Sequence, residues 1–310
     1  MSCAFLLGTR RASSYTEVMD SWRVGFAVAT LLLGHPLNRV RYQSNPQPRH
    51  VIVVAHEDDW QLFMGDDVRE LLRGPDSTTF IYLTAGDDGR DSLYWRTREE
   101  AALQSTRVAL ATPGLDSASC RDSFLGPHAI RECVLGKTKS FFLRLPDGKR
   151  NGTGFERYAR QSLRKLRTKR IESITAVDST ATYKGWGDLV ATVSELAGPN
   201  DRDVTVLTTD PSVRVNPHDH FDHRMAGLLI ADARRSAEWT LAYYVGYALA
   251  TRAVNRSSEQ ARVKTAIFRA YDEEMTRVDK KWSAYSEHPA FYSQCMLRTY
   301  SRWTAARRNK

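Results

Sequence analysis

The chain has 310 residues, of which 42% are hydrophobic and 26% charged, and its formal net charge is +9. Its length suits one large α/β domain with added segments, and its ordinary apolar content predicts a sizeable core. Apart from residues 160–170 and the tail from Arg307, the positive charge is dispersed; no nucleic-acid module is recognisable, so we expect a solvated basic surface and no nucleic-acid partner.

Residues 1–48 have the composition of a leader followed by a linker. Three arginines (Arg10, Arg11 and Arg23) precede an apolar run at residues 24–33, which resembles the hydrophobic region of a signal peptide. The run is shorter than the roughly 20 residues of a membrane-spanning helix, and no clear cleavage site follows it. We expect an export signal or an uncleaved anchor, and therefore a secreted or membrane-anchored protein with membrane or cell-wall association through this segment. The alternatives are a disordered leader and a short amphipathic helix.

The first predicted unit joins a buried strand to a helix. Residues 50–54 form an almost wholly apolar run, which is typical of a strand buried on both faces of a parallel sheet, and a helical pattern follows at residues 58–73. His56, Asp58 and Asp59 stand where the strand opens into the helix, and this is the edge at which open α/β sheets bind ligands. Such groups are costly to bury unless a metal or a substrate uses them, although either aspartate could instead cap the helix.

The following elements are a strand at residues 78–84, a loop at residues 86–92 and a helix at residues 93–111. Residues 113–139 show no clear periodicity, and we expect them to be irregular. They contain Cys120 and Cys133, which could form a disulfide in an exported protein and would be free thiols in a cytosolic one. No Cys-x-x-Cys occurs, which argues against a cysteine-based metal site.

The rest of the chain continues the alternation of strands and helices. The expected elements are a strand at 140–145 ended by a Pro-Asp-Gly turn, a basic and partly helical stretch at 155–170, a strand at 171–177, helices at 188–197, 224–235 and 260–279, and strands at 204–208 and 239–247. Tyr183 is a candidate pocket residue.

A second cluster of titratable side chains follows the strand at residues 204–208. It holds His218, His220, Asp222 and His223. Catalytic zinc sites usually take three protein ligands from His and Asp or Glu and leave one position for water. The two clusters together supply that ligand set, with spare groups for acid and base work. Asp222 is also a plausible helix N-cap, and we favour that role for it.

Three segments resemble the PIG-L/LmbE-like de-N-acetylase family. Ala55-His56-Glu57-Asp58-Asp59 is similar to the family's first motif, usually Ala-His-Pro-Asp-Asp, and His220-Phe221-Asp222-His223 is similar to its His-Pro-Asp-His motif. Residues 82–89, followed by Arg98-Glu99-Glu100, fit the middle segment. The resemblance covers roughly residues 50–303. It implies zinc-dependent removal of an N-acetyl group, typically from an N-acetylglucosamine unit.

The resemblance also implies roles for single residues. His56, Asp59 and His223 would hold one Zn²⁺ per chain. Asp58 would be the general base toward the metal-activated water, and His220 would stabilise the oxyanion or protonate the leaving amine. The family's middle loop and the following helix start line the sugar pocket, so the candidate substrate contacts include Asp87, Asp88, Arg90 and Arg98. Each of these four could equally form a surface ion pair.

The chain departs from the family pattern at several positions. Glu57 and Phe221 replace the two prolines, but both are linker positions, so metal ligation should survive. Trp60 stands where many members carry a glutamate, which puts that glutamate's supporting role in doubt and could reshape the pocket mouth. His218 is an extra histidine that could replace His220 or His223 as a ligand.

We therefore expect an α/β fold, with a Rossmann-like, mostly parallel sheet covered by helices on both faces. The first strand would be central, with both motifs at its carboxyl edge, in a domain spanning residues 49–305 before a basic tail at 306–310. The expected activity is that of a zinc-dependent N-acetylglucosaminyl deacetylase acting on an N-acetylated amino sugar. The alternatives are a catalytically decayed, secreted glycan-binding protein and a zinc amidase for a non-sugar acyl amide; the sequence leaves the particular sugar and the oligomeric state open.

Overall fold

The computed structural model describes residues 49–115, 117–198 and 203–305. Within these ranges an eight-stranded sheet has the order β10-β9-β8-β1-β2-β5-β4-β3. The predicted leader and basic tail lie outside the described residues. The strands are β1 (Arg49–Val54), β2 (Ser77–Thr84), β3 (Ser119–Leu125), β4 (His128–Leu135), β5 (Thr138–Leu145), β8 (Val204–Thr209), β9 (Thr240–Tyr244) and β10 (Ser301–Thr304).

The centre of this sheet is parallel. Strand β1 pairs in parallel with β2 and β8, β2 with β5, and β8 with β9. The pairings nearer the two edges, β10 with β9, β4 with β5 and β3 with β4, are antiparallel. Val51 and Val53 of β1 pack into one apolar cluster, and Ile52 and Val54 pack into another on the opposite face. Because β1 is buried on both sides, its apolar residues do not alternate with polar ones. The predicted fold class and the central position of the first strand are confirmed.

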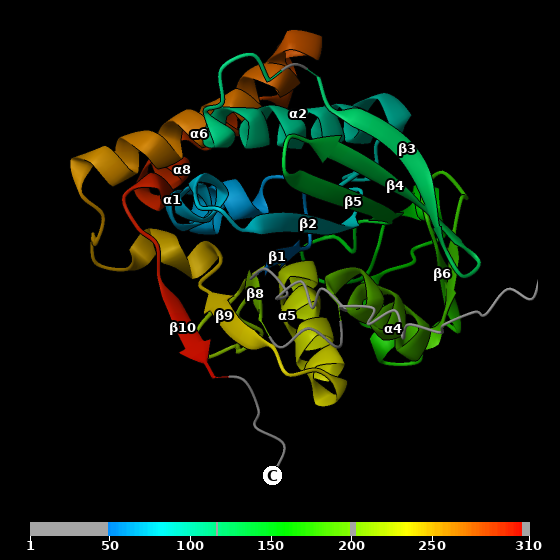
Figure 1. Cartoon of the computed structure of the whole chain (residues 1–310). Helices are drawn as coiled ribbons and strands as arrows, with labels where there is room; N and C mark the ends of the chain where they lie inside the picture. Colours follow the sequence, from blue (N-terminus) through cyan, green and yellow to red (C-terminus); the bar gives the residue numbers. More distant parts are fainter. Residues whose placement is uncertain (1–48, 116, 199–202, 306–310) are drawn as a thin grey trace, which may run out of the picture. The chain divides into compact units, whose positions relative to one another are not determined.

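Helices cover both faces of the sheet, as Figure 1 shows. One face carries α1 (Asp59–Arg73), α2 (Ser92–Leu110), α6 (Ser258–Val278) and α8 (Pro289–Met296), and the other carries α3 (Leu163–Arg167), α4 (Gly185–Ala197) and α5 (Phe221–Ala233). Smaller elements are the two-stranded sheet of β6 (Ser173–Thr175) and β7 (Thr182–Lys184), the short helix α7 (Ala284–Glu287), and the 3-10 helices η1 (Glu156–Tyr158), η2 (Arg234–Ser236), η3 (Tyr247–Thr251) and η4 (Lys280–Trp282).

The prediction of an irregular segment at residues 113–139 was wrong. Much of it forms the hairpin β3–β4 at one edge of the sheet, with Cys120 opposite Cys133, and these two cysteines form a disulfide. The hairpin escaped detection because β3 is an edge strand: it is polar and mostly exposed, so it lacks the apolar alternation of a half-buried strand.

Tyr183 is not a pocket residue, since it is fully buried in β7 with its ring stacked on His128. The strand expected at 171–177 is shorter than predicted and belongs to the small second sheet.

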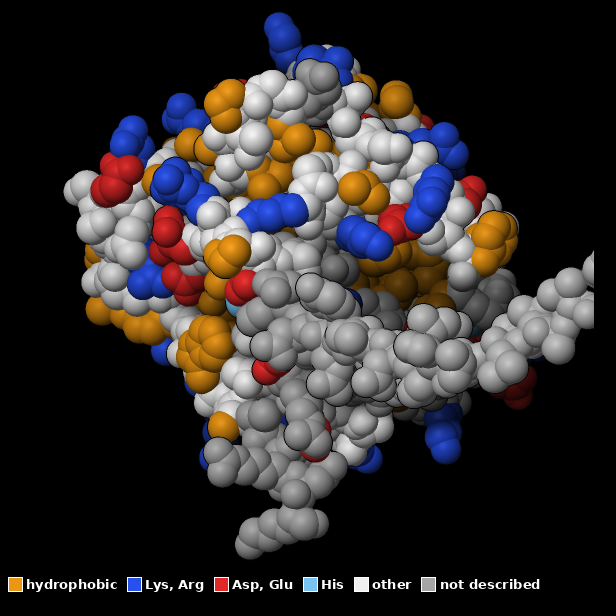
Figure 2. Space-filling model, in the orientation of Figure 1, with side chains coloured by type: hydrophobic (Ala, Val, Ile, Leu, Met, Phe, Trp, Pro, Cys, Tyr) orange, Lys and Arg blue, Asp and Glu red, His pale blue; other side chains and the backbone are white. Residues whose placement is uncertain are grey.

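Two features bear on the expected membrane or cell-wall association: the distribution of surface charge and the length and polarity of the helices. On the face in Figure 2, lysine and arginine side chains are dispersed among acidic and apolar ones. Across the described ranges, each helix is too short or too polar to cross a membrane. The apolar run at residues 24–33 lies outside those ranges.

Candidate active site

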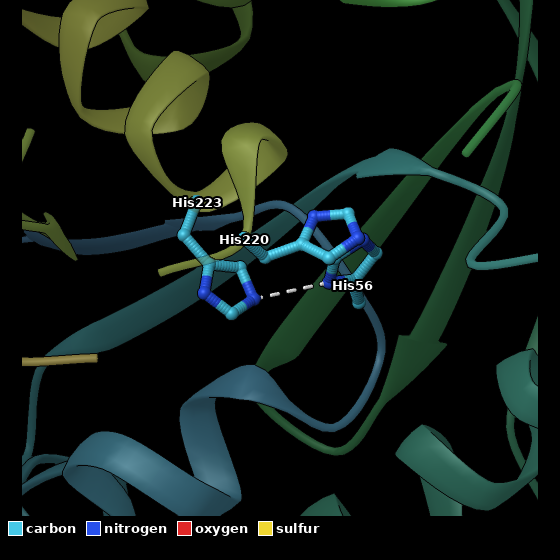
Figure 3. Close-up of side chains that lie close together, drawn as sticks. All are labelled: His56, His220 and His223. Carbon is cyan, nitrogen blue, oxygen red and sulfur yellow. Dashed lines mark hydrogen bonds between the residues drawn. The ribbon is translucent and has the colours of Figure 1, made fainter. Parts of the chain in front are cut away.

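The two titratable clusters meet at the carboxyl edge of the central strands. His56 follows β1, and Asp59 begins α1; His220 and His223 lie at the start of α5, which follows β8. Because β1 and β8 are hydrogen-bonded neighbours, both strand ends point to one place. His56 and His223, 167 positions apart in sequence, come within 3.2 Å of each other, the contact dashed in Figure 3.

Three ligand-type atoms form a tight triangle. His56 Nδ1 lies 3.2 Å from His223 Nε2 and 3.5 Å from Asp59 Oδ1, and His223 Nε2 lies 3.0 Å from that same oxygen. Ligands that surround a zinc ion tetrahedrally at about 2.0–2.2 Å are separated from one another by about 3.3–3.6 Å. The triangle therefore has nearly the size that one shared zinc ion requires.

Hydrogen bonds on the outer side hold two of these groups in orientation. Asp59 Oδ2 accepts the backbone N–H groups of Ala55 and His56, at 3.1 and 2.9 Å, which leaves Oδ1 facing the histidines. His223 Nδ1 lies 3.0 Å from Asp219 Oδ1, so a proton on Nδ1 leaves Nε2 free to bind a metal. A carboxylate behind a ligating histidine is the usual support of a metal site.

Opposite charges face each other at this triangle. Burial opposes ionisation of both Asp59 and His223, but the histidines facing Asp59 hold the pKa of its carboxyl well below the usual value. Against the same burial penalty, Asp59 and Asp219 raise the pKa of His223 to about 10. Asp59 therefore presents an ionised carboxylate to the two histidine rings.

His220 forms the N-cap of α5 with its side chain. The backbone N–H of Asp222 donates to His220 Nδ1 at 3.2 Å, so a neutral ring carries its proton on Nε2. Burial, together with the positive charge of His56, lowers the pKa of His220 to about 3. His220 is thus a neutral hydrogen-bond donor at the cleft, with Nε2 3.7 Å from Asp147 Oδ1.

The predicted N-cap role of Asp222 was wrong, because His220 occupies that position. Asp222 is fully buried, and its Oδ2 accepts the backbone N–H of Gly148 at 2.7 Å and lies 3.7 Å from His56 Nε2. Its negative charge faces His56 and His220, and those neighbours lower its pKa against the cost of burial. Asp222 therefore supports the site from behind.

Asp58 stands beside the triangle with its carboxylate available. It occupies the N-cap position of α1 but makes no side-chain cap hydrogen bond, so capping does not explain it. A carboxylate oxygen of Asp58 lies within 4.8 Å of ligand-type atoms of His56 and Asp59. Its side chain is 17% exposed, and Oδ1 accepts a hydrogen bond from Arg98 Nη2 at 2.6 Å.

A cleft opens above these groups. Its floor includes His56, Asp58, Asp147 and His220. The other lining residues come from two walls, the loop and helix after β2 (Gly86, Asp88, Arg90, Tyr94 and Arg98) and a C-terminal wall (Tyr247, Tyr271, Met275, Lys281, Trp282, Ala284, Glu287 and Tyr292).

The remaining predicted residues divide into those at the cleft and those away from it. Arg90 and Arg98 line it, whereas Asp87 is fully buried and its oxygens accept the backbone N–H groups of Gly89 and Asp147, so it holds the loop. Burial, with the nearby charge of Asp147, raises the pKa of Asp87 to about 7.

Two suggestions drawn from the family departures were wrong. Trp60 is fully buried and donates from Nε1 to Tyr82 Oη at 3.0 Å, so it does not shape the pocket mouth. His218 is exposed and is absent from the His56, His220 and His223 cluster, so it does not replace either family histidine.

Sequence reasoning missed three acidic residues of the site. Asp147 lines the cleft, but the Pro-Asp-Gly sequence around it was interpreted only as a turn. Burial, with the charge of Asp222, raises the pKa of Asp147 to about 6 despite the opposing charge of His56. Asp219 has a sequence signal, since it lies four residues before His223 and therefore one turn away. Glu57 is the third. It occupies a linker position of the motif, but its buried side chain accepts a hydrogen bond from Arg98.

Comparison with known proteins supplies a family and several distant structures. The family model described as PIG-L, GlcNAc-PI de-N-acetylase, matches residues 51–234. No curated protein matches the chain.

The solved structures that match include the N,N'-diacetylchitobiose deacetylase from Pyrococcus horikoshii, with 13% identity over 84% of each chain and a TM-score of 0.46. A deacetylase of teicoplanin biosynthesis matches with 11% identity over 78% of this chain and 93% of its own, at a TM-score of 0.44. GalB, the 4-carboxy-2-hydroxymuconate hydratase from Pseudomonas putida KT2440, matches with 12% identity over 85% and 99%, at a TM-score of 0.41. At such low sequence identity and structural similarity, the activities of these proteins are not transferred to this chain.

Proposed function

Because the chain belongs to the PIG-L family of GlcNAc-PI de-N-acetylases, matched over more than half of its length, we propose that it is a zinc-dependent hydrolase that removes the N-acetyl group from an N-acetylglucosamine-type amino sugar or glycoconjugate. The observation that carries the proposal is the triangle of His56 Nδ1, Asp59 Oδ1 and His223 Nε2, with sides of 3.0 to 3.5 Å. These three residues would hold the zinc ion.

The donor set suits that ion. Two imidazoles and one carboxylate are a common ligand set of catalytic zinc, and the cleft leaves room for a fourth ligand. When bound, zinc lowers the pKa of a water molecule to about 7 and polarises a carbonyl group. The chain's own side chains then have to accept a proton, stabilise an oxyanion and deliver a proton to nitrogen.

Asp58 is the proposed general base. Its carboxylate accepts a proton from the attacking water as the bond between the water oxygen and the acetyl carbon forms. The same proton passes to the sugar nitrogen as the C–N bond breaks, so the immediate products are acetic acid and the free amine. The acid then gives up its remaining proton, and acetate and the ammonium form of the amine leave the site. Proton transfer by a positioned carboxylate contributes roughly 100- to 10,000-fold to the rate.

His220 is the proposed oxyanion donor. Its Nδ1 accepts the N–H of Asp222, which leaves an N–H at Nε2 for the oxygen of the tetrahedral intermediate. Burial lowers the pKa of His220, and a neutral ring with its proton on Nε2 suits this electrostatic role better than donation of a proton to the amine. Asp58 is thus left as the proton carrier.

The binding-protein alternative has less structural support than the enzyme. Trp60, the residue that could have reshaped the pocket mouth, is fully buried. On the face in Figure 2, the positively charged side chains are dispersed. Sugar and non-sugar acyl amides remain to be distinguished by a substrate screen.

We also propose that the protein works outside the cytoplasm. The disulfide between Cys120 and Cys133 supports this location, because disulfides persist mainly in oxidising compartments. Secretion or anchoring through residues 1–48 would follow from the apolar run in that segment.

The test combines metal content with acetate release. Elemental analysis of the purified chain should find about one zinc per chain, and His223→Ala should lose it. His218→Asn is the matched control, because His218 is exposed and outside the cluster, and it should keep both metal and activity. Acetate release is then measured on N-acetylated sugars and on simple acyl amides. A wild-type chain that binds no zinc when zinc is supplied would refute the proposal.

A further inference from the structure

The side chain of Arg98 joins two carboxylates of the first motif. Its Nε donates to Glu57 Oε2 at 3.0 Å, and its Nη2 donates to Asp58 Oδ1 at 2.6 Å. The exposed fractions of the Arg98, Glu57 and Asp58 side chains are 11%, 1% and 17%. One guanidinium group is therefore shared between the proposed base and a carboxyl group that is almost completely buried.

The loop after β2 leaves space for this arrangement. Gly86 has φ +51°, and a Cβ atom at this position would lie 2.6 Å from both Arg98 Nε and Glu57 Oε2. Real Cβ atoms essentially never approach so closely, and side chains disfavour this backbone conformation. The loop is thus compatible with the Glu57–Arg98 pair only while residue 86 lacks a side chain.

The geometry indicates what Glu57 does to Asp58. An arginine can donate two parallel hydrogen bonds to one carboxylate, which engages both of its oxygens. Here Glu57 takes the Nε–H of Arg98, and the hydrogen bond from Arg98 to Asp58 is to Oδ1. Without Glu57, the guanidinium would be able to turn and bind both oxygens of Asp58, so that neither oxygen would face the attacking water without a hydrogen bond to the cation.

We propose that Glu57 is a positioning residue: through Arg98 it holds Asp58 so that one oxygen of the base stays available to the attacking water. This inference rests on the proposed function, in which Asp58 is the base. It assigns Arg98 to orientation of the base rather than to the substrate. It also gives a reason for a glutamate at a position where the usual motif has a proline.

Kinetics of Glu57→Ala and Glu57→Gln test the proposal. Glu57→Ala should lower kcat about 10- to 100-fold, as expected for a misplaced catalytic group, with KM changed less than about twofold. Glu57→Gln should recover most of that loss, because its amide oxygen can accept from Arg98 Nε. Both variants should still bind one zinc, and Glu70→Gln, an exposed substitution on α1, should leave kcat unchanged.

A double-mutant cycle separates action through Arg98 from a general loss of structure. If Glu57 acts through Arg98, then Glu57→Ala should cost little further activity in an Arg98→Ala background. Independent, multiplicative losses would overturn the proposal. So would loss of zinc from Glu57→Ala, or an unchanged kcat in that variant.

Crystal structures provide a readout that does not depend on activity. Glu57→Ala should show Arg98 bonded to both oxygens of Asp58, whereas Glu57→Gln should retain the shared arrangement. A single contact to Oδ1 in Glu57→Ala would refute the positioning role even if the enzyme is active. If no acyl amide is hydrolysed by the wild type, the proposed function fails, and these structures still decide whether Glu57 controls the orientation of Asp58.

Discussion

Asp219 illustrates how one side chain can organise several parts of the site. Its Oδ1 accepts the backbone N–H groups of His220 and Tyr247, at 2.9 and 3.3 Å, and faces His223 Nδ1 at 3.0 Å. It therefore fixes the ring orientation of one proposed ligand and also joins the start of α5 to the loop after β9. A residue in this position would support metal binding without touching the metal.

We predict that Asp219→Ala weakens zinc binding by about 10- to 100-fold, the usual cost of removing a carboxylate behind a ligating histidine. Competition against a chelator of known affinity measures the change. Asp232→Asn, also on α5, is the control, because Asp232 pairs with Arg235 and Trp186 away from the histidines. Equal zinc affinity in wild type and Asp219→Ala would show that His223 needs no such support.

At the scale of elements, the C-terminal part of the chain adds a wall to the cleft. Tyr271 and Met275 come from α6, Trp282 from η4, and Tyr292 from α8. All four lie beyond the end of the family match at residue 234. Trp282 packs edge-on against Tyr94 of α2, with ring centroids 5.0 Å apart, so this wall meets the opposite one at the rim.

We predict that Trp282→Ala raises KM several-fold for the preferred substrate and changes kcat less. Trp282 lines the cleft but belongs to its rim, so it contributes to binding rather than to the reaction. Steady-state kinetics check this, with Tyr285→Phe as the control because Tyr285 does not line the cleft. A fall in kcat at constant KM would contradict the assignment of this wall to substrate binding.

The same wall is anchored by a buried lysine. Lys264 of α6 is fully buried, and its Nζ donates to the carbonyl groups of Cys295 and Arg298 and to Thr299 Oγ1. These bonds tie α6 to the segment that ends α8 and leads to β10. Burial lowers the pKa of Lys264 to about 8, although Asp66 opposes the shift.

Because folding lowers the pKa of Lys264, we predict that the stability of the protein rises with pH in the alkaline range. Between about pH 8 and the unfolded value near 10.4, the unfolded chain binds one more proton at Lys264 than the folded chain, so stability should rise with pH. The contribution is at most about 1.4 kcal/mol per pH unit. Urea unfolding of the wild type and of Lys264→Met from pH 7 to 10 measures this contribution as the difference between their free energies of unfolding. A difference that stays flat or falls above pH 8 would contradict the prediction.

At the scale of the whole molecule, one covalent link joins two strands at the edge of the sheet. The Cys120–Cys133 disulfide connects β3 to β4 across 13 positions of sequence. Closing a loop of this size limits the unfolded chain and stabilises the fold by about 3 kcal/mol in the chain-entropy account.

We predict that Cys120→Ala/Cys133→Ala lowers the free energy of unfolding by about 2–4 kcal/mol and leaves the zinc content at one per chain. Denaturant unfolding and elemental analysis measure the two quantities. Cys295→Ala is a poor control, because Cys295 is buried in the core; treatment of the wild type with a reductant serves instead. Unchanged stability after reduction would show that the hairpin forms equally well without the link.

Much of the architecture was predictable because its signals are local. The continuous apolar run of β1, the strand and helix alternation, and the two motif segments can all be recognised in short windows of sequence. Burial on both faces makes a strand apolar throughout, and a titratable cluster directly after such a strand is chemically unusual. The fold class, the central first strand and the meeting of His56, Asp59 and His223 followed from those local features.

The tertiary structure decided everything that depends on contacts between distant segments. Asp147, Asp219 and Glu57 carry ordinary local signals, and their roles appear only when β5, α5 and α2 bring their partners near. The hairpin β3–β4 was missed because an exposed edge strand needs no apolar pattern. The sequence by itself supplied, through the two family motifs, the residues proposed to hold a metal and to act as base. Side-chain packing across the sheet edge determined which nitrogen or oxygen of each residue faces the site, because that choice is made by hydrogen-bond partners far away in the chain.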